Sequence, residues 1–253
     1  NPKNIFSFYK SRLKRILPIY WLITCFVIFL YLIFPEIFKQ LKIDFNRAIT
    51  SILFISQATG SGHPIINIGW TLEWEMLFYL IFGVSIYFKS IRKIIISIFI
   101  MVVIIFIFSK NLFFFEFLIG VFIGYLHHKY KINHTSGIII FLLGFLILTL
   151  SLNQKIEVMY DRFIIWGLPA ALIVFGSVYA KSINNPLLYY LGNASYSIYL
   201  VQILTVPGFY KFISHFKIEF QNDILSLICL FLSVSFGCFF HTFIEKKMRF
   251  DRR

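Results

Sequence analysis

Long apolar stretches separated by short polar segments dominate this chain of 253 residues. A transmembrane helix needs about 20 apolar residues and rarely fewer than about 17. Eight stretches approach or exceed this length: 17–36, 70–88, 94–108, 112–127, 137–152, 162–180, 195–213 and 223–243. Because lipid cannot satisfy an open backbone edge, each is expected to be helical. The pattern predicts an all-α fold, a polytopic membrane helical bundle of about eight transmembrane helices, forming one membrane-embedded domain over residues 1–253.

The segment between the first two predicted spans, about 37–69, is the longest loop on the predicted outer side. Residues 49–59 are apolar but too short to span, so they are expected to be interfacial or part of a folded loop. The stretch "ATGSGHPIINIG" at 58–69 follows, and it contains His63 as a candidate substrate contact. Loops of this length often carry function.

Composition and charge agree with a membrane protein. The chain is 59% hydrophobic and 14% charged, whereas soluble domains are about a quarter charged. If the N-terminus is cytoplasmic, 16 of the 24 Lys and Arg residues lie on the cytoplasmic side, as expected for short loops. We therefore expect a multi-pass protein of the cell (inner or plasma) membrane with both chain ends cytoplasmic. The net charge of +13 then indicates contact with anionic lipids and no nucleic acid.

Metal and cofactor motifs are missing from the sequence. The three cysteines lie in apolar stretches and are expected to be small core residues. There is no CxxC, HExxH, GxGxxG or Walker pattern, so we expect no metal and no permanently bound cofactor.

Two glutamates interrupt the apolar stretch "WTLEWEMLFY", which begins with Trp70 at the predicted outer interface. Glu73 lies near the helix start, where the helix dipole favours a carboxylate. Glu75 lies deeper and shares a helix face with Tyr79. An ionisable residue inside a span is a functional candidate, although packing against an arginine is the alternative. We predict Glu75 and Tyr79 as catalytic residues, with Trp70 in the supporting polar core.

A basic segment, "FYKSRLKRILPIY" at 8–20, precedes the first span. Arg12 and Arg15 are three residues apart, so they point the same way at the predicted cytoplasmic end of the helix. Arginine side chains bind phosphate through two parallel hydrogen bonds. Ordinary positive-inside anchoring explains the same charges.

Two later spans carry further polar groups. Ser195, Tyr199 and Gln202 follow one another at i, i+4 and i+7, which places them along one helix face, either as a functional stripe or as polar contacts between helices. Glu116 lies about one turn into another span. A GxxxG pattern at 120–124 follows it and predicts close helix packing.

Taken in order, these motifs resemble the acyltransferase 3 family of membrane O-acyltransferases. The resemblance covers essentially the whole chain and rests on "RxxRIxPxY" (12–20), "WTLxxExxFYL" (70–80), "EFxxG" (116–120), "SYSIYL" (195–200) and "FIEK" (243–246). Two positions depart from the family pattern, with Gln202 where histidine is common and Lys247 where proline is usual.

The resemblance implies an activity. Family members have about ten membrane helices and pass an acyl group, usually acetyl, from cytoplasmic acyl-CoA to a glycan hydroxyl at the outer face. It implies that Arg12 and Arg15 bind the CoA phosphates. It also places an essential histidine two spans before these arginines. The chain begins at Asn1, so we expect an N-terminally truncated fragment that lacks about two helices and the catalytic histidine.

The expected function is therefore acetyl-CoA-dependent O-acyl transfer to a glycan or lipid-linked glycan of the cell surface. In this mechanism Glu75 orients the basic imidazole, and Tyr79, Tyr199 or Ser195 donates to the oxyanion. Ordinary roles are expected for the histidines within this chain, including His241 near the inner end of the last span. The alternative is a polytopic glycan transporter or flippase without acyl chemistry, which explains the spans and the intramembrane carboxylates but gives no reason to combine the RxxR and WxLxxE motifs.

Overall fold

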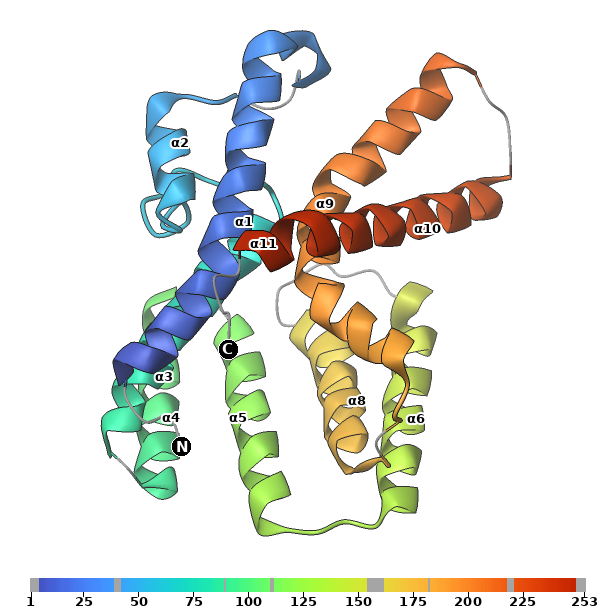
Figure 1. Ribbon diagram of the computed structural model, residues 1–253. Coiled ribbons are helices and arrows are strands. Elements are labelled where there is room, and N and C mark those ends of the chain that lie inside the picture. Colours follow the sequence, from blue (N-terminus) through green and yellow to red (C-terminus); the bar gives the residue numbers. More distant parts are fainter. Residues whose placement is uncertain are drawn as a thin grey trace. The chain divides into compact units, whose positions relative to one another are not determined.

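The computed structural model describes residues 5–38, 42–88, 90–109, 112–153, 162–181, 183–217 and 221–248 (Figure 1). Over these residues all regular elements are helical and no strand is present, which confirms the predicted all-α class. The predicted cytoplasmic ends fall partly on residues 1–4 and 249–253, outside the described residues.

The apolar ranges predicted from the sequence all fall on helices. The α-helices are α1 (Ile5–Ile33), α2 (Phe45–Ile52), α3 (Gly69–Ser85), α4 (Ile91–Ser109), α5 (Phe113–Lys129), α6 (His134–Leu150), α8 (Leu168–Tyr179), α9 (Pro186–His215), α10 (Asn222–Phe240) and α11 (Lys246–Met248). Short 3₁₀ turns are η1 (Pro35–Phe38), η2 (Ile86–Phe88) and η3 (Ser151–Asn153), and π-helical turns are η4 (Phe163–Gly167) and η5 (His241–Glu245).

Two of these helices are both long and apolar enough to cross a membrane, judged by length and composition. They are Ile5–Ile33 and the continuous helical segment Asn222–Met248. The helices His134–Leu150 and Phe163–Tyr179 are apolar but shorter. At 1.5 Å per residue, a helix of 17 residues covers about 25 Å, less than the hydrocarbon core of about 30 Å. The described residues therefore show two span-length apolar helices, and eight spans remain a prediction.

Many apolar side chains on these helices are exposed. On α6, more than half of the surface of Leu142, Phe145 and Leu146 is accessible, and α10 exposes Leu227 and Phe231 to a greater degree. Contiguous apolar surface of this kind is typical of contact with lipid or with another protein. These faces agree with a protein that lies in a bilayer.

The chain divides into two compact units. Unit 1 comprises residues 1–5 and 77–183, and α6 packs closely on α8 within it. This approach depends on glycine, because a Cβ at Gly176 would collide with the backbone of Phe141. Gly120 and Gly124 on α5 have no atom within 4 Å of a built Cβ. The predicted close packing at 120–124 is therefore wrong for the described part of this unit, and the close approach occurs between α6 and α8 instead.

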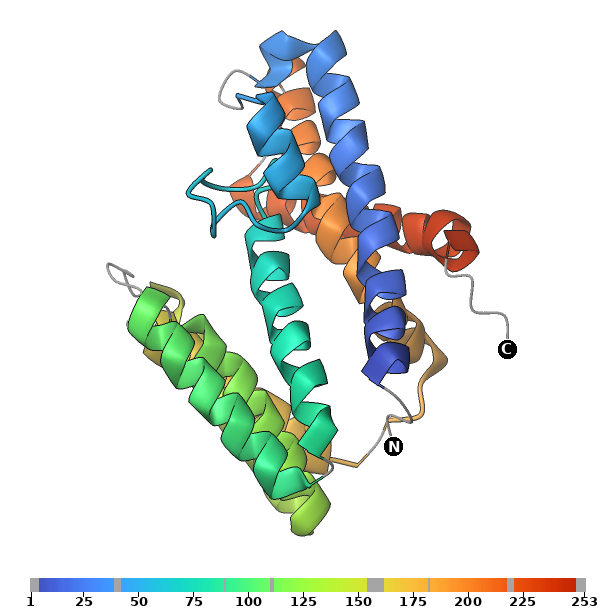
Figure 2. The ribbon, with the colours of Figure 1, turned by 90° about the vertical axis from the view of Figure 1, so that its left-hand side faces the viewer.

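Unit 2 comprises residues 6–76 and 184–253 and contains α1, α2, the start of α3, α9 and the α10–η5–α11 segment. α2 lies beside α1 in Figure 1 and in Figure 2. The Tyr20 hydroxyl lies 3.1 Å from the Ser51 hydroxyl, and its ring lies 4.3 Å from that of Phe54. Residues 45–52 form α2 and turns follow it, so the folded-loop interpretation of 49–59 is confirmed.

Candidate functional site

The buried hydroxyl of Tyr196 lies at the centre of a polar cluster in unit 2. It donates a 2.9 Å hydrogen bond to the carbonyl of Ile16, which joins α9 to the turn of α1 that carries Arg15. Four ionisable side chains interact electrostatically with this hydroxyl: Glu75 of α3, Glu245 of η5, and Tyr20 and Arg15 of α1. We call these five residues the Tyr196 cluster. Charged or ionisable groups from three other sequence motifs therefore act electrostatically on Tyr196, whose direct hydrogen bond is to α1.

The two predicted phosphate-binding arginines lie on α1, next to this cluster. Arg12 is half-buried, and its guanidinium carbon lies 5.5 Å from the centre of the Phe8 ring. Arg15 is exposed to solvent apart from its interaction with Tyr196. The exposed guanidinium of Arg15 is accessible to an anionic ligand.

Tyr199 ties α9 to the first turn of α3. Its hydroxyl donates to the carbonyl of Ile68 at 3.0 Å and lies 2.6 Å from the Thr71 hydroxyl. Glu75 is half-buried one turn beyond Thr71 and interacts electrostatically with Tyr199 as well as Tyr196. Because its hydroxyl hydrogen already binds a backbone carbonyl, Tyr199 serves to hold α3 in place. Trp70 is half-buried in the same first turn of α3.

The other glutamate of "WTLEWEMLFY" has a different task. Glu73 is buried, and its two carboxylate oxygens accept hydrogen bonds of 3.0 Å from the backbone N–H groups of Ser56 and Gln57. Such charge-assisted bonds to backbone donors fix a loop firmly. Glu73 therefore holds the loop between α2 and α3, which adds a specific partner to the helix-dipole effect predicted for it.

A second buried polar group lies where the last long helix changes its geometry. His241 and Glu245 are 1% and 0% exposed, and His241 Nδ1 lies 2.6 Å from Glu245 Oε2. Ser197 donates to the same oxygen at 2.5 Å. This differs from a nucleophilic triad, because serine and histidine both contact the carboxylate and not one another. The His241–Glu245 turn is π-helical, a feature frequent at functional sites.

The predicted stripe of Ser195, Tyr199 and Gln202 does not act as one unit. Ser195 is exposed and donates to the carbonyl of Gly192 in its own helix at 2.8 Å. Tyr199 binds the start of α3, as described above, and Gln202 is half-buried. The serine that faces the buried carboxylate is Ser197.

Two predicted site residues belong to unit 1. Tyr79 is half-buried on the part of α3 that belongs to that unit. Glu116 of α5 forms an ion pair with Arg162, with 3.2 Å between Glu116 Oε1 and Arg162 Nη1, and about a third of each side chain is accessible. A cavity of about 410 Å³ lies beside Glu116, lined also by Phe78, Phe117 and Gly120.

Sequence reasoning missed Tyr196, Ser197 and His241 as members of a site. Tyr196 and Ser197 lie inside a motif that was recognised, but its polar residues point in several directions around the helix. A signal for His241 was present, because it lies four residues before Glu245 in an otherwise apolar stretch. Two ionisable residues on one helix face within a span are expensive unless they pair.

These features define an all-helical protein in which arginine, glutamate and tyrosine side chains from distant motifs converge. The chain belongs to the acyltransferase 3 family, since the family model described as "Acyltransferase domain" matches residues 1–243. It is also similar to the exopolysaccharide production protein ExoZ of Rhizobium meliloti (strain 1021), with 33% identity over 84 residues. That match covers 32% of this chain and 26% of the relative, about a quarter of its length. No solved structure shows a significant match.

Proposed function

We propose that this protein is a membrane O-acyltransferase that passes an acyl group from cytoplasmic acyl-CoA to a hydroxyl of an extracytoplasmic polysaccharide. Family membership over residues 1–243 supports acyl transfer. The similarity to a relative named for exopolysaccharide production supports a polysaccharide acceptor, free or lipid-linked. The observation that carries the proposal is that one stretch of α9 binds three other motif regions: Tyr196 binds α1, Ser197 binds Glu245, and Tyr199 binds the residue before α3.

The charge pattern along α1 supports a proposal for where the acyl donor binds. Arg12 and Arg15 are the groups that we propose to bind the CoA phosphates, with the N-terminal end of α1 on the cytoplasmic side. Acetyl is the acyl group that the family resemblance implies. Binding energy from the phosphates, remote from the reacting carbonyl, would position the thioester against the Tyr196 cluster.

In the transfer step, the acceptor oxygen forms a bond to the thioester carbon and the carbon–sulfur bond breaks. The hydroxyl proton passes to a base, and the CoA thiol leaves protonated. Glu75 is the carboxylate that we propose to accept that proton or to orient the group that does. Tyr79 is proposed as a donor to the oxyanion that develops on the carbonyl. Glu116, paired with Arg162, has no direct part in this step.

The test is acyl transfer by the full-length gene product in lipid nanodiscs, with radiolabelled acetyl-CoA and a bacterial exopolysaccharide. Arg12→Ala and Arg15→Ala are each expected to raise the KM for acetyl-CoA at least tenfold, because each removes a bidentate phosphate contact. Lys14→Ala is the matched control, since it removes an equal charge from the same helix at an exposed position. It is expected to stay within twofold of the wild type.

If all three substitutions changed the KM equally, the arginines would act only as positive-inside anchors and not as a phosphate-binding site. Failure of the wild-type protein to bind CoA at all, while glycan still crosses the bilayer of proteoliposomes, would favour the flippase alternative instead.

A further inference from the structure

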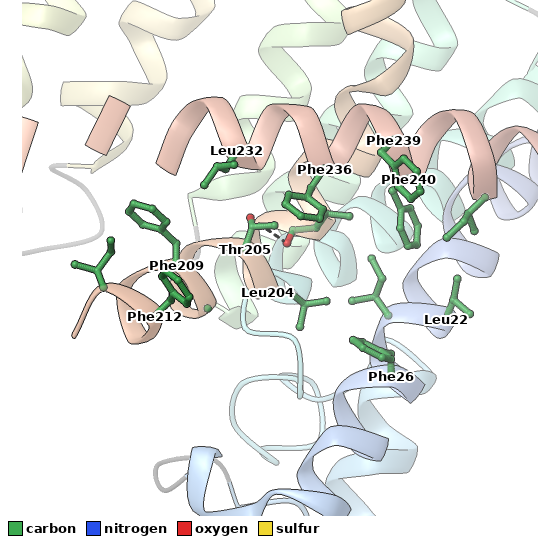
Figure 3. Close-up of a pocket in the computed structure, with 15 residues that line it drawn as sticks. Leu22, Phe26, Leu204, Thr205, Phe209, Phe212, Leu232, Phe236, Phe239 and Phe240 are labelled. Carbon is green, nitrogen blue, oxygen red and sulfur yellow. Dashed lines mark hydrogen bonds between the residues drawn. The ribbon is translucent and has the colours of Figure 1, made fainter. Parts of the chain in front are cut away.

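A large apolar pocket lies within unit 2, between α1, α9 and α10 (Figure 3). Its volume is about 840 Å³, and Phe26, Phe209, Phe236 and Phe240 contribute aromatic rings to its wall. Among the described residues that line it, Thr205 alone has a polar side chain, and its hydroxyl lies 2.9 Å from the Ser233 hydroxyl. The wall therefore suits a hydrocarbon ligand and offers almost nothing to a polar one.

The pocket begins where the buried polar groups end. Ile23 lines it one turn beyond Tyr20 on α1, and Val201 lines it one turn beyond Ser197 on α9. Ile244, next to Glu245, completes this end of the wall. Residues three and four apart share a helix face, so on two helices the pocket wall directly continues the face that carries the polar groups.

The order of features along α1 matches the order of groups in an acyl-CoA. The arginines come first, Tyr20 follows, and the pocket-lining stretch from Leu22 to Phe26 comes next. At 1.5 Å per residue, Arg15 to Phe26 covers about 16 Å along the helix. An acyl-CoA likewise presents phosphates at one end, the thioester inside the molecule and the hydrocarbon chain at the other end.

We propose that this pocket binds the hydrocarbon chain of the acyl donor, so that the protein selects acyl groups longer than acetyl. This rests on the proposed acyl-CoA-dependent function. Ligand pockets of about 300–1,000 Å³ enclose most of a drug-sized molecule, whereas a single acetyl methyl group would leave this one almost unfilled. Each methylene group buried there is expected to tighten binding about fourfold until the pocket is full.

The first experiment measures binding and transfer with CoA, acetyl-CoA, butanoyl-CoA and octanoyl-CoA. The protein is held in lipid nanodiscs, because detergent would compete for an apolar pocket. Octanoyl-CoA is expected to bind at least tenfold more tightly than acetyl-CoA, and its kcat/KM is expected to rise in parallel. CoA without an acyl group should bind no more tightly than acetyl-CoA.

A substitution at Gly208 tests whether this pocket is responsible. Gly208 lines the wall, and a Cβ built there has no atom within 4 Å, so Gly208→Leu can place its side chain in the pocket without a backbone clash. Gly208→Leu should weaken the binding of octanoyl-CoA at least tenfold and should leave the affinity for acetyl-CoA within twofold of the wild-type value. Gly208→Ala, which adds one methyl group and favours the helix, should give an intermediate loss and guards against a folding defect in the leucine variant.

Gly192→Leu is the matched control, because Gly192 lies on the same helix, has the same free space and is outside the pocket. It is expected to keep the wild-type preference. The pocket assignment would be overturned, with the proposed function intact, if acetyl-CoA and octanoyl-CoA gave equal affinity and kcat/KM. It would also be overturned if Gly208→Leu and Gly192→Leu weakened octanoyl-CoA binding equally. A protein that binds no acyl-CoA of any length would overturn both.

Discussion

At the scale of single residues, Glu73 and Glu75 lie two positions apart on α3 and have different partners. Glu73 binds two backbone N–H groups of the preceding loop, while Glu75 interacts with the tyrosines of α9. They occur within one short stretch and have the same chemistry. Their partners, and not their residue type, decide what each does.

Replacing each glutamate with glutamine should therefore give opposite results. Glu73→Gln loses the charge on a buried acceptor of two hydrogen bonds, so the free energy of unfolding should fall by about 1–3 kcal/mol. Glu75→Gln keeps the side-chain shape at a half-buried position and should leave that free energy unchanged within about 0.5 kcal/mol. It should lower kcat about 100-fold or more, because proton transfer contributes that much.

Reversible unfolding in mixed detergent and initial rates of acyl transfer measure the two quantities, and each variant is the control for the other. If Glu75→Gln unfolds more easily and retains full activity, Glu75 is a structural residue.

The residues of the site could be predicted only in part. Glu75 stands out from the sequence, because charge in an apolar span is rare, whereas Arg15 and "SYSIYL" stand out as parts of recognisable motifs. The choice between Ser195 and Ser197 depends on which helix face meets the last helix, and a local pattern does not contain that information. The contact of His241 with Glu245 joins residues four apart, so the sequence contained a signal for it, but only the fold shows that Ser197 of α9 meets the same carboxylate.

At the scale of elements, the apolar stretches predicted which parts of the chain are helical, but they did not predict where some of the helices begin. α1 begins at Ile5, twelve residues before the predicted start, because the lysine, arginine and leucine residues of its basic segment are good helix formers. α9 begins at Pro186 after Asn185, whose side chain accepts from the backbone of Leu187 and Leu188. That Asn–Pro pair is a recognisable helix start, which a search for apolar length alone passes over.

In unit 1, a glycine at a close helix contact and a glycine with free space around it should respond differently to replacement by alanine. Gly176→Ala adds a methyl group where α8 meets the backbone of α6, so the helices must move apart. The free energy of unfolding should fall by about 1–3 kcal/mol, as in other overpacked cores. Gly124→Ala is the control on α5, where the added methyl meets no atom and favours the helix.

Unfolding in mixed detergent should then order the proteins as Gly124→Ala, wild type and Gly176→Ala, from most to least stable. A Gly176→Ala protein as stable as the wild type would mean that α6 and α8 do not approach closely.

At the scale of the whole molecule, exposed apolar faces and charge asymmetry both indicate a bilayer. Two helices have span length, and large apolar side chains are exposed on shorter helices such as α6. Lysine and arginine residues are twice as frequent in the segments predicted to be cytoplasmic. This asymmetry orients a membrane protein through its short loops. In the predicted orientation, Arg12 and Arg15 would lie on the side of the membrane where acyl-CoA is made.

This orientation predicts on which side two positions of the chain lie. Gly62, exposed in the loop after α2, is predicted to face outward, and the end of the chain after Arg253 is predicted to face the cytoplasm. Alkaline phosphatase, which is active only outside, should be active when inserted at Gly62 and inactive when fused after Arg253. A fluorescent protein that matures only in the cytoplasm should give the reverse pattern. If both positions report the same side, the predicted orientation is wrong, because the loop that contains Gly62 and the C-terminal end of the chain are then not on opposite faces of the membrane.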